Sequence, residues 1–238
     1  MSADDERSGE RERERLRSTS RYSVWVGVAF VIVIAIASIN TFTNDEGGLL
    51  GADAQAGEPL PEFAVPELPG GEEADANIFQ DDCESSENPC PADERRTPAC
   101  EVDLPRVLRV CDFFDRPLVL SFWFTSPSEC PPTQDLVDDA AKRYRDRVNF
   151  LSIAVRGERG ELEEIIRERG WSMPVGWDRD GAVSNLYRVG VCPTVAFILP
   201  GGILSEAKIG TEELDRGQLG AAIDALLREA RRRAEATR

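Results

Sequence analysis

The pattern of apolar and polar positions in the second half of the chain predicts an α/β domain. Apolar runs rich in β-branched and aromatic residues predict three buried strands and a hairpin return strand, over residues 118–124, 148–155, 194–199 and 203–209. Apolar residues recurring three and four positions apart predict helices over residues 134–144, 160–169, 182–187 and 212–234. Residues 171–181 are rich in turn formers and are predicted as a loop. Together these elements predict a mixed central sheet flanked by helices.

The first 42 residues follow a different pattern. Residues 1–21 are rich in acids and arginines and predict a disordered cytoplasmic tail, whereas residues 22–42 carry no charge and are long enough to cross a bilayer. Arginines precede this span and acids follow it, so the positive-inside rule predicts a single-pass cell-membrane protein with an extracytoplasmic C-terminal domain. The alternatives are a cleaved signal peptide, with a small-residue site at 52–54, and a buried core helix.

The region after the predicted span leads into the folded domain. Residues 43–59 are predicted as an extracytoplasmic linker, and residues 60–235 as the domain itself. Alternating apolar positions at 60–68 predict a first or edge strand, which a pair of glycines would end. An insertion of about residues 70–111 follows, and its many acids, glycines and prolines predict a loop-rich segment.

Four of the six cysteines lie in this insertion, at Cys83, Cys90, Cys100 and Cys111. Their spacing matches no familiar zinc pattern, and the chain has no histidine to complete one. In an extracytoplasmic segment the ordinary interpretation is two structural disulfides, and proximity favours Cys83 with Cys90 and Cys100 with Cys111. One disulfide with two free thiols, or a metal site, remain as alternatives.

Composition narrows the chemistry. The net charge of −16 argues against a nucleic-acid-binding protein, which would carry a basic footprint. The absence of histidine excludes histidine-based acid–base catalysis, histidine-containing triads and histidine–metal sites. Candidate chemistry therefore rests on cysteines, carboxylates and backbone groups, and we expect no cofactor and no metal.

Cys130 has the setting of a reactive thiol. The apolar run 118–124 ends in a short polar loop, and Cys130 follows it directly before Pro131, Pro132 and a helical pattern. Proline is tolerated in the first turn of a helix, where unpaired N–H groups and the positive end of the dipole favour thiolate over thiol. Glu129 beside the thiol opposes this effect. The polar flanks also predict that Cys130 is not deeply buried.

Three separated motifs resemble those of a known family. They are FWFT at 122–125, CPPT at 130–133 and VCPT at 191–194. Their order resembles the thioredoxin fold, and specifically the membrane-anchored thioredoxin-like redoxins of the TlpA and ResA type, in the wider AhpC/TSA group. The resemblance covers about residues 60–231, with 60–68 similar to the family's opening strand.

The resemblance implies a site at Cys130. It implies that Pro193 is in cis and that the preceding loop places Cys192 near Cys130. Cys130 would then be the nucleophile and Cys192 the resolving thiol. Val191, Pro193, Thr133 and Trp123 would bind substrate, although Trp123 also fits a core position. A structural role for Cys192, or a static disulfide between the two cysteines, is the competing interpretation.

Several positions depart from the family. The second cysteine of a CxxC motif is Thr133 here, and the loop 126–129 is longer than the family's. Ser121 stands where thioredoxins carry a buried Asp, and Cys192 where the family usually lacks a cysteine. Pro127 stands where peroxiredoxins need a Thr, so standard peroxide reduction is not expected.

Two functions follow as hypotheses. The first is a membrane-tethered thiol–disulfide oxidoreductase in cell redox homeostasis, which would reduce or isomerise cysteines of exported proteins, for example in cytochrome maturation as in the family. It would need electrons from a membrane reductase or a low-molecular-weight thiol. The second is a catalytically degenerate thioredoxin-fold module that binds extended peptides or partner proteins without turnover.

Overall fold

The structure describes the C-terminal part of the chain. The computed structural model describes residues 56–78, 84–85, 88–89, 97–125, 130–210 and 214–236. The chain divides into two units, Met1–Gly47 and Gly48–Arg238, and every described residue belongs to the second. The predicted tail and membrane span lie outside the described residues. Among the described residues, no helix is long and apolar enough to cross a bilayer.

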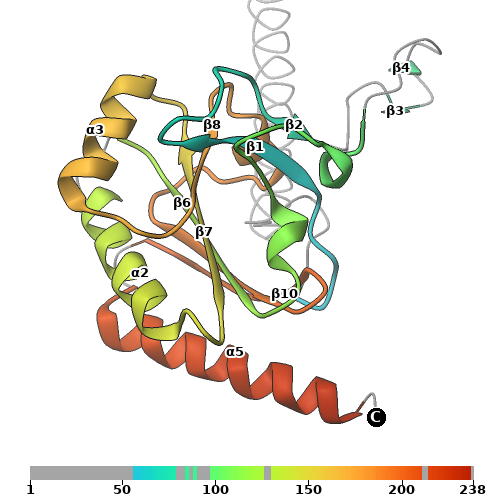
Figure 1. Ribbon diagram of the computed structural model, residues 1–238. Helices are drawn as coiled ribbons and strands as arrows, with labels where there is room; N and C mark the ends of the chain where they lie inside the picture. The colour runs from blue at the N-terminus through green and yellow to red at the C-terminus, as the bar shows by residue number, and fades with distance from the viewer. Residues whose placement is uncertain are drawn as a thin grey trace, which may run out of the picture. The chain divides into compact units, whose positions relative to one another are not determined.

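A mixed β-sheet organises the described unit (Figure 1). Its strands are β1 (Phe63–Leu68), β2 (Asn77–Ile78), β5 (Val107–Arg109), β6 (Leu118–Trp123), β7 (Asn149–Val155), β8 (Val175–Asp178), β9 (Thr194–Leu199) and β10 (Ile203–Ile209). They lie in the order β10-β9-β6-β7-β8-β1-β2, with β5 also paired to β1. Strands β6, β7 and β8 are parallel, and β9 and β1 run antiparallel to β6 and β8. A separate hairpin pairs β3 (Glu84–Ser85) with β4 (Asn88–Pro89).

Helices cover both faces of the sheet. They are α2 (Cys130–Tyr144), α3 (Arg159–Arg169), α4 (Ala182–Leu186) and α5 (Arg216–Ala236), with the 3-10 helices η1 (Ala99–Glu101) and η2 (Val110–Phe113). Apolar residues of α2, α3 and α5 pack into one buried cluster, and those of α4 and η2 pack into a second cluster on the opposite face. Figure 1 shows α2, α3 and α5 along the same side of the sheet. The fold expected from the sequence is therefore confirmed.

Strand β6 lies in the middle of the sheet, and its burial explains its unbroken apolar pattern. All six residues are buried. Val119 and Trp123 belong to the cluster under α2, whereas Leu120 and Phe122 belong to the cluster on the opposite face. Side chains alternate between the two faces of a strand, and helices cover both faces here, so every position of β6 is inside. Only Ser121 breaks the apolar run.

One predicted loop was wrong. The interval 171–181 contains β8, which pairs with β7 and β1 and is buried along its length. A Cβ atom at Gly176 would collide with the side chain of Val65. This glycine therefore reflects close packing of β8 on its neighbours, and not the turn that its presence in the sequence indicated.

Candidate functional site

Cys130 and Cys192 lie together, although 62 positions separate them in the sequence. They form a disulfide whose Cα atoms are 5.7 Å apart, a separation that is usual for this bond. Pro193, the next residue, has the cis peptide bond that the resemblance predicted. The two cysteine motifs of the sequence therefore meet at one site.

The pairing of β6 with β9 brings the two cysteines together. Phe122, near the end of β6, pairs with Thr194 at the start of the antiparallel strand β9. The segment that leaves β6 and the segment that enters β9 consequently share one edge of the sheet. The hydroxyl of Thr194 donates a hydrogen bond to the Val191 carbonyl at 2.6 Å, and this bond closes the turn that holds Cys192.

The two cysteines differ in exposure. Cys130 is 0% exposed and packs into the cluster between α2 and the sheet, whereas Cys192 is half-buried against that cluster. The prediction that Cys130 is not deeply buried was wrong. Its position on α2 turns the side chain toward the sheet, on the same helix face as the buried Gln134 and Val137. The polar loop 126–129, on which that prediction relied, lies outside the described residues.

The charges along α2 suit a thiolate at its first residue. The first turn of the helix has no acidic side chain, whereas Lys142 and Arg143 lie in its last turn. Cations stabilise the negative end of a helix dipole, and the positive end favours the thiolate of Cys130 over its thiol. Glu129, which was expected to oppose this effect, lies outside the described residues.

Only one of the other predicted site residues offers an exposed surface. Val191 is 54% exposed beside Cys192. Pro193 and Thr133 are buried, and Trp123 is fully buried with its ring edge-on to Trp171 at 5.0 Å between centroids. In this disulfide form Trp123 is a core residue, and Val191 is the exposed apolar side chain beside the pair.

A buried polar group under α2 was not predicted. Gln134 is 0% exposed, and its side-chain oxygen accepts hydrogen bonds from the hydroxyls of Ser121 at 2.9 Å and Ser152 at 3.0 Å. Ser121, one of the two donors, stands where the resemblance implies a buried Asp. The signal in the sequence was a Gln four residues after Cys130, on the same helix face, opposite a lone serine in an apolar strand.

Two buried carboxylates, those of Asp138 and Asp178, accept hydrogen bonds that stabilise the fold around the site. Burial by itself would raise the pKa of Asp138, but hydrogen bonds from Lys142, from the backbone of Ser172 and Met173 and from the Ser172 hydroxyl together hold this pKa below its ordinary value. These bonds tie α2 to the chain before β8. At Asp178 burial dominates and raises the pKa, although the N–H groups at the start of α4 donate to it.

The second described disulfide joins Cys100 and Cys111, the pairing that their closeness in the sequence favoured. Their Cα atoms are 5.8 Å apart, and the bond links η1 to η2. Glu62 lies near both sulfurs, and these three residues form the one group within the described ranges whose donor atoms lie close enough for a metal. Because both sulfurs are bonded to each other, they offer no thiolate to a metal. Cys83 and Cys90 lie outside the described residues.

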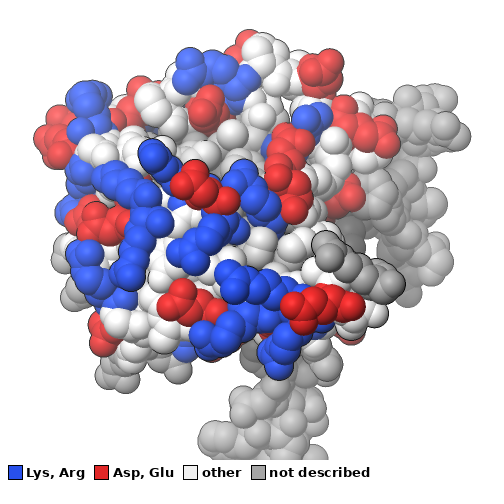
Figure 2. Space-filling view, turned by 60° about the horizontal axis from the view of Figure 1, so that its bottom comes forward, with Lys and Arg blue, Asp and Glu red and all other residues white. Residues whose placement is uncertain are grey.

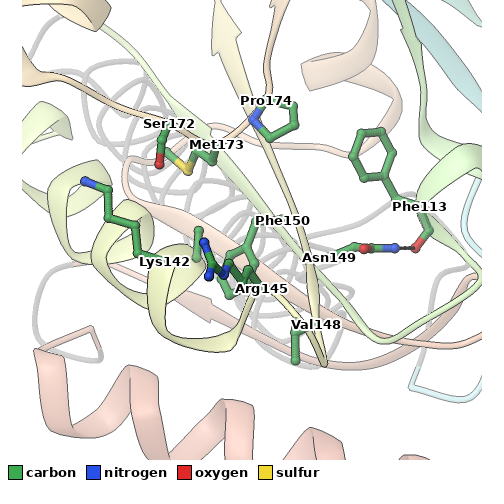
Figure 3. Close-up of a pocket in the computed structure, with 10 residues that line it drawn as sticks. Phe113, Lys142, Arg145, Val148, Asn149, Phe150, Ser172, Met173 and Pro174 are labelled. Atoms are coloured by element: carbon green, nitrogen blue, oxygen red, sulfur yellow. Dashed lines mark hydrogen bonds between the residues drawn. The ribbon is translucent and has the colours of Figure 1, made fainter.

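A pocket of about 400 Å³ lies at the other end of α2 (Figure 3). Lys142 and Arg145 come from the end of this helix, Asn149 and Phe150 from the start of β7, and Met173 from the segment before β8. None of the predicted site residues lines this pocket.

Basic side chains gather on the face that carries α5 and the end of α2, as Figure 2 shows. The guanidinium groups of Arg143 and Arg147 lie 5.5 and 4.9 Å from the centroid of the Tyr144 ring. Arg228, Arg231 and Arg232 are exposed on α5. This face of the acidic chain therefore carries many basic side chains, with acidic ones among them.

The fold described above is thioredoxin-like. The structure assigned as thiol:disulfide interchange protein DsbE of Chlorobium tepidum aligns with a TM-score of 0.55 and 17% identity, over 74% of this chain and 99% of that one. At this identity the likeness concerns the fold.

Curated relatives add a likeness in sequence. Thiol-disulfide oxidoreductase ResA of Oceanobacillus iheyensis is 30% identical over 117 residues, which are 49% of this chain and 60% of the relative. ResA of Geobacillus kaustophilus is 26% identical over 112 residues, 45% of this chain and 64% of the relative. This chain thus spans less than two thirds of the relatives it matches. No protein-family model matches it. The comparisons confirm the expected similarity to thioredoxin-like redoxins of the ResA type.

Proposed function

We propose that this protein is a thiol–disulfide oxidoreductase whose redox centre is the pair Cys130 and Cys192. The observation that carries the proposal is the disulfide between the first residue of α2 and the residue before the cis-proline. This pair replaces the CxxC motif, whose second cysteine is Thr133 here. The similarity to ResA supports the same reaction class.

The reduced pair would pass two electrons to a disulfide of a partner protein. One thiolate of the pair attacks a partner sulfur, a mixed disulfide forms, and the first partner thiolate leaves. The other thiol of the pair then loses its proton and attacks the mixed disulfide. The Cys130–Cys192 bond forms and the second partner thiolate leaves. The sequence-based hypothesis gives the attack to Cys130 and the resolution to Cys192.

The proposal includes a location and partners. The uncharged span 22–42 would tether the domain to the outer side of the cell membrane, with the N-terminus in the cytoplasm. Its partners would be exported proteins with cysteines or disulfides, and its electrons would come from a membrane reductase or a small thiol. A protease added to intact spheroplasts should digest the domain, and protection of the domain would contradict this location.

Turnover of the full chain tests the enzymatic proposal. With a protein disulfide as substrate and limiting glutathione as reductant, wild type should turn over, whereas Cys130→Ser and Cys192→Ser should each lose at least about 100-fold of this activity because neither can close the internal disulfide. Activity of Cys192→Ser that returns in excess glutathione would show instead that a small thiol resolves the mixed disulfide, with Cys130 as the single catalytic cysteine. The matched control, Cys100→Ser combined with Cys111→Ser, should keep the activity. Equal activity of Cys130→Ser and wild type would overturn the proposal.

The exposed Val191 favours a second candidate function. An apolar side chain beside the cis-proline loop suits recognition of an extended peptide segment, without any turnover. In that case, glutathione would leave the Cys130–Cys192 disulfide closed while peptides still bind, and Val191→Asp would abolish binding. Opening of the disulfide by glutathione would support the oxidoreductase instead.

A further inference from the structure

The exposure of the two cysteines points to a division of roles opposite to the one expected from the sequence. We infer that Cys192 is the sulfur that partners reach, and that Cys130 is the buried thiolate that leaves and resolves. The side-chain N–H groups of Gln134 and Trp123 donate hydrogen bonds to this thiolate. The inference deepens the proposed oxidoreductase function and rests on it.

Access determines which sulfur is attacked. Thiol–disulfide exchange needs the incoming thiolate to contact one sulfur and to expel the other. Cys130 is 0% exposed, whereas Cys192 is half-buried and follows Val191, which is 54% exposed. An incoming thiolate therefore meets Cys192 first, and Cys130 is the leaving group.

Two unpaired donors lie in the layer that holds Cys130. Within the described residues, the buried side-chain nitrogens without a hydrogen-bond partner are Trp123 Nε1 and Gln134 Nε2. Both side chains are 0% exposed. Buried donors are nearly always paired in native proteins, because an unpaired one is destabilising. Trp123 shares a buried cluster with Cys130, and Gln134 is buried on the same helix as Cys130. In this inference, the acceptor for both donors is the thiolate that forms at Cys130 during the reaction.

The positions of these donors fit a thiolate at Cys130. Gln134 follows Cys130 by one helical turn, and side chains on a helix lean toward its amino terminus, which here means toward Cys130. The hydrogen bonds from Ser121 and Ser152 fix the oxygen of Gln134 against the sheet, so that its NH₂ group is free to donate. Trp123 lies two residues beyond Ser121 on the same face of β6.

The assigned roles give a balanced reaction. A glutathione thiolate attacks the sulfur of Cys192, a glutathione–Cys192 bond forms, the internal disulfide breaks, and Cys130 leaves as a thiolate. A second glutathione thiolate then attacks the glutathione sulfur, which yields oxidised glutathione and the Cys192 thiolate, so two electrons enter the pair. Toward a partner disulfide, the Cys192 thiolate attacks one partner sulfur, a mixed disulfide forms and the first partner thiolate leaves. The Cys130 thiolate then attacks the Cys192 sulfur, the internal disulfide forms and the second partner thiolate leaves.

Trapping of the wild-type full chain tests this order. The oxidised protein is mixed with limiting glutathione, quenched in acid within seconds, and mapped by peptide mass spectrometry. Glutathione should be found on Cys192, with Cys130 as the free thiol. Glutathione on Cys130 would overturn the inference while leaving the proposed function intact. A disulfide that glutathione does not open at all would overturn both.

Single-cysteine variants give an independent measurement. In Cys130→Ser the remaining Cys192 should react with an aromatic disulfide at least about tenfold faster than Cys130 reacts in Cys192→Ser. The reason is that the rate of this reaction depends on how accessible the thiol is to the disulfide. Equal rates, or a faster Cys130, would contradict the assigned roles. Circular dichroism of both variants verifies that the fold is kept.

Gln134→Met tests the donor. This change keeps the length of the side chain and removes both the NH₂ group and the oxygen that accepts from Ser121 and Ser152. Opening of the disulfide by glutathione should slow at least about tenfold, since a hydrogen bond to a charged group is lost, and the loss of the two serine bonds should appear separately as lower stability. Leu136→Met, a change of similar size on the same helix, is the control and should react as wild type does. A purely structural role for Gln134 predicts lower stability with an unchanged opening rate, and that result would remove Gln134 from the inference.

Discussion

The two described disulfides join different kinds of structural element. The Cys100–Cys111 bond joins two short 3-10 helices that are 11 positions apart in sequence, and both cysteines are half-buried. The Cys130–Cys192 bond joins a helix start to a cis-proline loop 62 positions away, and it has one buried and one half-buried cysteine. The first therefore links two neighbouring 3-10 helices, whereas the second joins the start of α2 to the loop that carries the exposed Val191.

Under the proposed function, exposure alone would not identify the redox disulfide. Measured by exposure, the bond in the insertion is the more accessible of the two. What would distinguish the Cys130–Cys192 bond, in the inference above, is the stabilisation of a departing thiolate by the helix dipole and by the buried N–H groups of Gln134 and Trp123. No such donors surround Cys100 and Cys111 among the described residues.

Removal of each disulfide should give the largest effects on stability. In the chain-entropy account, closing a 62-residue loop contributes about 4 kcal/mol and closing an 11-residue loop about 3 kcal/mol. Urea unfolding of the oxidised full chain should therefore show the greater loss for Cys130→Ser with Cys192→Ser, and the smaller for Cys100→Ser with Cys111→Ser. The reverse order would mean that the insertion disulfide holds more than a local turn.

Substitution of Asp138, which ties α2 to the segment before β8, should give the next largest loss of stability. Asp138→Ala removes a buried acceptor of several hydrogen bonds, and the free energy of unfolding should fall by about 3 kcal/mol. Asp139→Ala, which removes an exposed carboxylate paired with Arg216, is the control and should cost less than about 1 kcal/mol. Equal costs in urea unfolding would contradict the role given to Asp138.

The effect of Asp138 should also depend on pH. Its pKa is lower in the folded protein than the ordinary value of 3.8. As pH falls below that ordinary value, the unfolded chain takes up a proton before the folded one does, so this contribution to stability decreases. The difference in the free energy of unfolding between wild type and Asp138→Ala should have its full size near pH 7 and shrink below about pH 4. A difference that does not change with pH would contradict an ionised Asp138.

Ser152→Ala should give the smallest effect. It removes one of the two hydroxyls that donate to Gln134 and should cost about 1 kcal/mol in urea unfolding. The Cys100–Cys111 region should be unaffected, as measured by protease sensitivity of the insertion. A loss as large as that of Asp138→Ala would mean that the polar group under α2 carries more of the fold than its two hydrogen bonds indicate.

Much of the fold could be predicted because local pattern and tertiary environment agree. The strands at 194–199 and 203–209 have the predicted bounds, since both combine apolar runs with a clear turn between them. Strand β8 was missed because Gly176 reads as a turn former in the sequence, and only its contact with Val65 shows why a glycine is needed. Pattern arguments do not include such contacts between distant strands.

The candidate site could be predicted in part. The cysteine residues, the cis-proline and the meeting of the two motifs all followed from short stretches whose order fits one fold. The burial of Cys130 could not be predicted, because it depends on which face of α2 packs against the sheet. Cys192 lies in the loop before β9, and its half-buried position depends on how that loop packs against the same cluster.

The sequence by itself determined the order of elements, the acidic charge, the lack of histidine and the two cysteine motifs, because each is a local property of the chain. Only the tertiary structure decided that Ser121, Gln134 and Ser152 share one buried polar group and that the side-chain nitrogens of Trp123 and Gln134 are buried without a hydrogen-bond partner. Hydrogen-bond partners in a core come from strands and helices far apart in sequence. Their pairing is fixed by packing, and no periodicity along the chain encodes it.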